Sequence, residues 1–216
     1  MVRVKVCGHK RPDDARMSCA YGADAVGVLV GQTHVSADFV PLDAARAIFA
    51  AVPPFIARVL VTHVMEASDI VALVTTAGAD HVQLHGACTP ATVRALRAAL
   101  PRVRLIKTVH VQDARSVDIV RSWPSLVDAV LLDSASPATG QIGGTGRPHD
   151  WRLSARIVQD TSLPVILAGG LHGGNVGQAI ACVRPFAVDA NSGTKQADGY
   201  KDPARLAAFI QAAKAA

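Results

Sequence analysis

The chain is poor in aromatic residues, which make up 4% of its 216 residues. Few aromatic side chains leave little for nucleic-acid bases to stack on. Lysine and arginine are spread along the whole chain without a basic stripe, although the formal net charge is +5. We therefore expect no nucleic-acid partner, and we attribute the positive charge to the attraction of a phosphorylated small molecule.

No apolar run reaches the length of a membrane-spanning helix. The chain also begins directly in a predicted strand, without the pattern of a signal peptide. Its four cysteines, Cys7, Cys19, Cys88 and Cys182, show no CxxC spacing, which argues against a zinc site and a disulfide framework. These absences predict a cytoplasmic protein with no membrane partner.

No GxGxxG motif follows the first predicted strand, so the usual signal of a dinucleotide-binding fold is missing. Half of the residues are hydrophobic, and most of these are Ala, Val, Leu and Ile. This composition is typical of parallel strands that are buried on both faces and covered by alanine-rich helices.

Apolar, β-rich runs alternate with amphipathic stretches along the whole chain. Strands are predicted at residues 2–7, 24–30, 57–62, 80–84, 103–109, 127–132, 164–168 and 186–190. Helices are predicted at residues 11–22, 41–52, 67–77, 89–99, 113–122, 149–159, 173–181 and 203–215. Eight regular pairs without a linker favour a closed barrel over an open sheet. The prediction is a single-domain α/β protein, a (β/α)8 TIM barrel over residues 1–216.

Two polar residues, Cys7 and Asp133, stand directly after predicted hydrophobic strands. Glycine-rich turns follow two later strands, at residues 167–171 and 189–193. Taken singly, a buried cysteine is usually a small hydrophobe, and an aspartate after a strand is often a turn former. Because the carboxyl ends of barrel strands meet at one mouth, their shared position instead predicts an acid–base site beside a phosphate site.

Alternation along the strands predicts which other side chains face the barrel interior. With Cys7 facing inward, Lys5 shares its face, and the same parity places Gln83 with His85, and also Lys107, inside. A buried charge needs a partner, so we expect Lys5 or Lys107 to meet an inward carboxylate. A cation beneath Cys7 is also expected to lower the pKa of its thiol. For Lys107, a plain salt bridge in the barrel floor is an equally open interpretation.

Short motifs that carry these residues run in order along nearly the whole chain. They are Lys5–Gly8, Gly22–Gly27, Val82–Gly86, Leu131–Ser134, Gly143–Arg147, Ala168–Leu171 and Arg184–Asp189. In this order they resemble the phosphoribosylanthranilate isomerase family of tryptophan biosynthesis. The resemblance implies an isomerase that converts N-(5-phosphoribosyl)anthranilate to its 1-deoxyribulose 5-phosphate product by an Amadori rearrangement, without metal or cofactor. It also implies Cys7 as the general base and Asp133 as the general acid.

The resemblance and the strand parity together give a set of substrate-binding residues. The predicted set is Lys5, His34, Gln83, His85, Gly144, Gly169, Gly170, Asn191, Ser192 and Gly193. Backbone N–H groups of the glycine-rich turns are expected to hold the phosphate. The segment 143–146 is interpreted as a mobile loop that shields the intermediate, with a plain connector as the alternative. The expected partner is a phosphorylated small-molecule substrate, and the expected state is a monomer or a homodimer.

The sequence departs from the family in the loop after the second strand, and again at residues 62–64 and 191–195. In that loop the family carries an arginine that contacts the anthranilate carboxylate, whereas residues 31–40 contain no arginine and only His34 as a cation. An isomerase would then meet the carboxylate through His34 or His63. The alternative is a divergent paralogue that acts on a different phosphorylated sugar or N-glycoside in a specialised pathway. A non-catalytic binder is disfavoured, because binding alone needs neither Cys7 nor Asp133.

Overall fold

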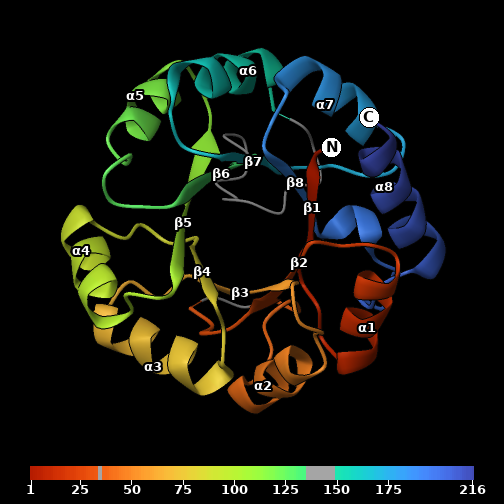
Figure 1. Ribbon diagram of the computed structural model, residues 1–216, viewed down its shortest axis with the longest axis horizontal. Coiled ribbons are helices and arrows are strands. Elements are labelled where there is room, and N and C mark those ends of the chain that lie inside the picture. Colours follow the sequence, from red (N-terminus) through yellow and green to blue (C-terminus); the bar gives the residue numbers. More distant parts are fainter. Residues whose placement is uncertain (34–35, 135–148) are drawn as a thin grey trace.

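The structure is a computed structural model that describes residues 1–33, 36–134 and 149–216. Its strands are parallel, pair in chain order and close into a barrel where β8 meets β1 (Figure 1). The strands are β1 (Arg3–Val6), β2 (Ala25–Leu29), β3 (Ala57–Thr62), β4 (His81–Leu84), β5 (Arg104–Val111), β6 (Ala129–Ser134), β7 (Val165–Leu167) and β8 (Ala187–Ala190). The helices are α1 (Pro12–Ala20), α2 (Leu42–Ala50), α3 (Ala67–Ala77), α4 (Pro90–Ala99), α5 (Arg115–Arg121), α6 (Trp151–Asp160), α7 (Val176–Val183), the 3-10 helix η1 (Ser192–Thr194) and α8 (Pro203–Ala215). The predicted (β/α)8 barrel is confirmed.

Hydrophobic side chains of the strands pack in two layers because successive residues point to opposite faces. Val4 and Val6 of β1 belong to the large outer layer between the strands and the helices. Val59, Leu131 and Ile166 fill a smaller layer inside the barrel. The barrel is therefore packed in its middle, and polar inward side chains have room mainly at the strand ends.

Lys107 lies on the outer face of β5, so the prediction that it faces the barrel interior was wrong. Its neighbour Ile106 packs inside the barrel, and Lys107 is paired in register with the outward-facing Leu84 of β4. The Lys107 ammonium donates hydrogen bonds to the carbonyls of Leu84 (3.3 Å) and Gly86 (2.7 Å). The face of a residue follows from the register between strands, which the parity of one strand alone does not fix.

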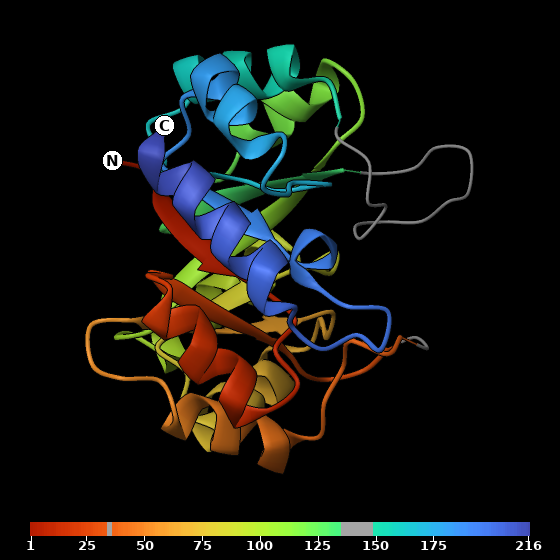
Figure 2. The ribbon, with the colours of Figure 1, turned by 90° about the vertical axis from the view of Figure 1, so that its right-hand side faces the viewer.

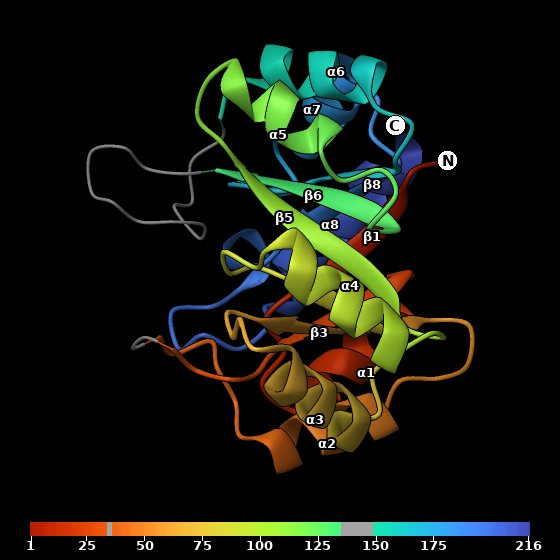
Figure 3. The same cartoon turned by 90° about the vertical axis from the view of Figure 1, so that its left-hand side faces the viewer.

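Both termini lie on the side of the barrel from which the strands start (Figures 2 and 3). Since all the paired strands run in the same direction, the residues that follow them gather on the opposite side. Among the described helices, none combines the length and the apolar character that a membrane crossing requires.

Candidate active site

The carboxyl ends of several strands bring titratable side chains to one mouth of the barrel. Cys7 follows β1, His85 follows β4, Asp133 lies near the end of β6, and Asp189 lies in β8. Cys7, Asp133 and Asp189 are only 6–7% exposed. At this burial, each charge or thiolate depends on its protein neighbours rather than on water.

Lys5 and Asp189 form a buried ion pair between the adjacent strands β1 and β8. Lys5 Nζ lies 3.0 Å from Asp189 Oδ2, and the two residues are paired in register. Burial alone would lower the pKa of Lys5, but the charges of Asp189 and Cys7 raise it on balance. The ammonium therefore stays charged, and the prediction that Lys5 meets an inward carboxylate is confirmed.

The thiol of Cys7, beside this pair, has a pKa above its ordinary value. Burial is the main cause, since a thiolate here loses its hydration; Lys5 opposes the rise and Asp189 adds to it. Lys5 does act on the thiol pKa in the predicted direction, but desolvation outweighs it and Asp189 partly cancels it, so the net shift is upward. On the other side, the Lys201 ammonium donates to the backbone carbonyl of Cys7, and burial lowers the pKa of Lys201 to about 7.

Asp133 is a buried carboxyl group, and burial raises its pKa to about 6. The backbone N–H of Ser134 donates to Asp133 Oδ1 at 2.7 Å and moderates the rise. The negative charge of Asp189 adds to it, while Lys5 opposes it. A carboxyl group with this pKa retains a proton often enough near neutral pH to act as a general acid.

Ring contacts connect Phe39 to three histidines in a row. The ring centroids are 5.5 Å apart between Phe39 and His63, 4.6 Å between His63 and His85, and 5.0 Å between His85 and His110. Burial lowers the pKa of His85 well below its usual value and that of His110 to about 4. Both imidazoles are therefore uncharged near pH 7. His85 Nε2 lies 3.9 Å from Oδ2 of Asp133.

The glycine-rich turns after β7 and β8 approach each other closely. Gly169 and Gly170 have φ angles of 86° and 66°, which favour glycine. A Cβ on Gly193 would lie 2.1 Å from the carbonyl oxygen of Leu171. Among the described residues, the backbone N–H groups of Gly169, Gly170, Ser192 and Gly193 have no acceptor. Two adjacent turns with free donors suit a bound anion.

Asn191, predicted to bind substrate, is engaged with the loop after β2. Its Nδ2 donates to Asp38 Oδ2 at 2.8 Å, and the Lys195 ammonium pairs with the other oxygen of the same carboxylate. The side chains of Asn191 and Lys195 thereby connect the turn after β8 to the loop after β2. Since Asp38 and Lys195 are 157 residues apart, no local sequence pattern indicates this contact.

Of the remaining predicted residues, one is buried beside His85 and two lie outside the described residues. Gln83 is 2% exposed, and its amide nitrogen lies 3.4 Å from Nδ1 of His85. His34 and Gly144, with the predicted loop 143–146, lie outside the described residues. His110 was missed because the predicted strand stopped at residue 109, whereas β5 runs to Val111. The parity that was predicted for this strand, with Lys107 inside, would also have placed His110 outside. Its register with Asp133 of β6 shows that His110 belongs to the inner face.

These elements define a (β/α)8-barrel protein with an acid–base site at the carboxyl ends of its strands. The family model for N-(5′-phosphoribosyl)anthranilate (PRA) isomerase matches residues 4–212. The chain is 43% identical to N-(5′-phosphoribosyl)anthranilate isomerase 2 of Methanosarcina mazei, over 99% of this chain and 94% of that protein. It is 40% identical to the isomerase of Methanopyrus kandleri, over 99% of each chain. The chain belongs to the N-(5′-phosphoribosyl)anthranilate isomerase family, as its motifs predicted.

Solved structures of phosphoribosyl anthranilate isomerases also align with this chain over its full length. Phosphoribosyl anthranilate isomerase of Thermotoga maritima aligns over the full length of both chains with a TM-score of 0.86 and 34% identity. A phosphoribosyl anthranilate isomerase in complex with reduced 1-(o-carboxyphenylamino)-1-deoxyribulose 5-phosphate aligns as completely, with a TM-score of 0.85 and 32% identity. Thiamine phosphate pyrophosphorylase of Pyrococcus furiosus, at 13% identity and a TM-score of 0.72, shares the fold alone.

The buried ion pair leads to a prediction about stability. Lys5→Met should lower the free energy of unfolding by about 3–5 kcal/mol, because it leaves the Asp189 carboxylate buried and unpaired. Arg16→Met, which breaks the exposed pair with Asp13, serves as the control and should cost less than about 1 kcal/mol. Urea unfolding followed by circular dichroism measures both. Equal losses in the two variants would contradict the assigned importance of the buried pair.

Proposed function

We propose that this protein is an N-(5′-phosphoribosyl)anthranilate isomerase of tryptophan biosynthesis. The observation that carries the proposal is the placement of Cys7 and Asp133 at one mouth of a barrel that aligns end to end with named isomerases. The direct test is turnover of phosphoribosylanthranilate by the purified protein, beside complementation of a tryptophan auxotroph that lacks the isomerase. The alternative, a paralogue with a different phosphorylated substrate, is not favoured by this full-length similarity.

In the proposed reaction, Asp133 donates its proton to the ring oxygen of the ribose, and the C1′–O bond breaks as the ring opens to a Schiff base. Cys7, as the thiolate, then takes the proton from C2′, and the electron pair moves toward nitrogen to give an enolamine. The enolamine tautomerises to the 1-deoxyketose. The raised pKa of Asp133 suits the first step, because the group must be protonated when it acts.

The thiolate needed for the second step forms at a buried position, which disfavours it. Lys5, Lys195 and Lys201 all attract the thiolate charge and limit this penalty. The ion pair with Asp189 holds the Lys5 ammonium in place on the inner face of β1. We therefore assign Lys5 a positioning and electrostatic role, with the proton transfer itself left to Cys7.

The substrate phosphate is assigned to the adjoining turns after β7 and β8. Support comes from the N–H groups of Gly169, Gly170, Ser192 and Gly193, which lack an acceptor within residues 1–33, 36–134 and 149–216, and from the close approach of Gly193 to Leu171. Backbone donors of this kind hold a phosphate without any basic side chain. This end of the substrate is expected to anchor the sugar while the reacting carbons face Cys7 and Asp133.

The carboxylate of the anthranilate ring needs a cation or several hydrogen-bond donors. Lys195 is the cation that the fold places against the loop after β2, where it pairs with Asp38. His63 lies next to the same loop, because its ring contacts the ring of Phe39. We assign the carboxylate to Lys195, with His63 beside the aromatic ring.

Cys7→Ser and Asp133→Asn should each reduce kcat by at least about 10²-fold with the fold intact. Each substitution keeps the size of the side chain but removes the proton acceptor or donor. Steady-state kinetics and circular dichroism measure the two effects. Near-normal turnover in either variant would remove that residue from the proposed mechanism.

The two pKa shifts predict the pH profile of kcat/KM. Below about pH 6 both Cys7 and Asp133 hold a proton, so the thiolate is lost; above the raised thiol pKa both are ionised, so the acid is lost. Between these limits the two groups hold one proton between them. The fraction of enzyme that carries it on Asp133, with Cys7 as the thiolate, then does not change with pH. We therefore expect a plateau that falls on both sides.

Asp133→Asn is the control for this profile, because its residual rate depends on the thiol alone. In this variant the fall of kcat/KM on the acid side should move from about pH 6 up to the thiol pKa. The fall of kcat/KM on the alkaline side should disappear. An unchanged limb near pH 6 in this variant would assign that limb to the substrate phosphate, whose second pKa is about 6, instead of Asp133.

Gly193→Ala should raise KM for phosphoribosylanthranilate by about tenfold or more, because its Cβ collides with the Leu171 carbonyl and displaces the phosphate turn. Gly177→Ala is the matched control: it lies in helix α7 with open space at its Cβ, and it should leave KM unchanged. Initial-rate kinetics compare the two. Equal KM values would argue against the phosphate assignment.

A further inference from the structure

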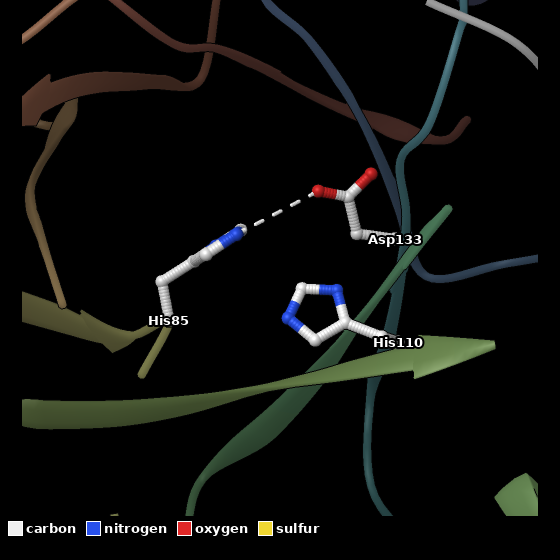
Figure 4. A group of neighbouring side chains, drawn as sticks. All are labelled: His85, His110 and Asp133. Carbon is white, nitrogen blue, oxygen red and sulfur yellow. Dashed lines mark ion pairs between the residues drawn. The ribbon is translucent and has the colours of Figure 1, made fainter. Parts of the chain in front are cut away.

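Three metal-ligating side chains converge at the barrel mouth from three successive strands. One ligand atom each from His85, His110 and Asp133 lies within 4.8 Å of the other two, and Figure 4 shows the two imidazoles and the carboxylate facing a common space. Two histidines and one carboxylate form a ligand set typical of divalent transition metals with open coordination positions.

The ring of His110 packs against His85, whose backbone slightly raises its pKa, but neither ring nitrogen makes a hydrogen bond of normal geometry to a described residue. Both nitrogens are buried. A buried polar atom without a partner is costly, and it calls for a physical explanation. Lys107, on the same strand, faces the other side of β5, where its ammonium donates to the carbonyls of Leu84 and Gly86. Its charge still acts on both imidazoles and lowers their pKa values, so an ion bound here has to outweigh that repulsion.

The other two ligands are oriented toward the same space. His85 Nδ1 lies 3.4 Å from both the Thr108 hydroxyl and the Gln83 amide nitrogen. In the tautomer whose Nδ1–H donates to Thr108, the lone pair of Nε2 faces Asp133. Such an outer hydrogen bond fixes the tautomer of a metal-binding histidine. Asp133 Oδ1 accepts the Ser134 N–H, which leaves Oδ2 for a ligand. Both imidazoles are uncharged, as metal binding requires.

We propose that His85, His110 and Asp133 form a binding site for a divalent transition-metal ion such as Zn²⁺, and that the bound ion inhibits the enzyme. Two ligands on tetrahedral zinc lie about 3.3 Å apart, since each bond is about 2.0 Å. The ligand atoms of the three side chains, which lie within 4.8 Å of one another without an ion, would therefore have to approach by about 1.5 Å or less when zinc binds. The bound ion displaces the Asp133 proton, so the inhibition rests on the acid role given to Asp133 above.

The test is a titration of chelator-treated, reduced protein with ZnCl2 in a calorimeter and with Co²⁺ in a spectrophotometer. We expect one equivalent to bind, with visible cobalt bands typical of nitrogen and oxygen ligands. His110→Phe keeps the ring against His85 but removes both ligand atoms, and it should weaken binding at least tenfold. His110→Asn is a second variant in case the phenylalanine disturbs folding. His81→Gln, at the opposite end of β4, is the matched control and should bind as the wild type does.

Turnover is measured on the same proteins. Zn²⁺ should inhibit the wild type reversibly, with recovery on adding EDTA. His110→Phe, measured relative to its own zinc-free rate, should need at least tenfold more zinc for half inhibition. Equal zinc affinity in wild type and His110→Phe, or a cobalt spectrum with thiolate charge transfer from Cys7, would overturn the site. Binding without inhibition would overturn the inhibitory part. Because the titration needs no substrate, failure of the proposed isomerase activity would leave the binding result standing.

Discussion

Closure of a parallel barrel is the constraint on which the rest of this structure depends. Each strand must bury apolar side chains on both faces, against the helices outside and against the other strands inside. Charged inward side chains are then tolerated only where they find a partner, as Lys5 and Asp189 do on adjacent strands. The same closure sends every strand end to one mouth, so that Cys7 and Asp133 belong to one site.

Burial, more than any single charge, sets the chemistry of that mouth. Desolvation raises the pKa values of both Cys7 and Asp133, and it lowers those of His85 and His110. Desolvation thus raises the protonated fraction of the acid near neutral pH and makes the thiolate scarce. An Amadori isomerase needs one proton shared between an acid and a base, and this environment supplies it without a further cofactor in the proposed steps.

The loop after β2 departs from the pattern that the family resemblance led us to expect. It lacks the expected arginine, and Asp38 in this loop instead pairs with Lys195 from the turn after β8. In the proposed complex, the cation near the aromatic end of the substrate would thus come from the turn after β8. A relative is recorded as a dimer, in Thermotoga maritima, and the expected monomer or homodimer stays a prediction for this chain.

The barrel, the order of its elements and the two strand-end residues Cys7 and Asp133 followed from the sequence, because hydrophobic period and residue position are local properties. The outward face of Lys107 and the raised pKa of Cys7 did not, since strand register and desolvation depend on the packed neighbours. His110 was missed because it lay one residue beyond a predicted strand whose parity, with Lys107 inside, also assigned it to the outer face. Contacts between distant segments, such as Asp38 with Lys195, exist only when the barrel closes, and the tertiary structure alone decided them.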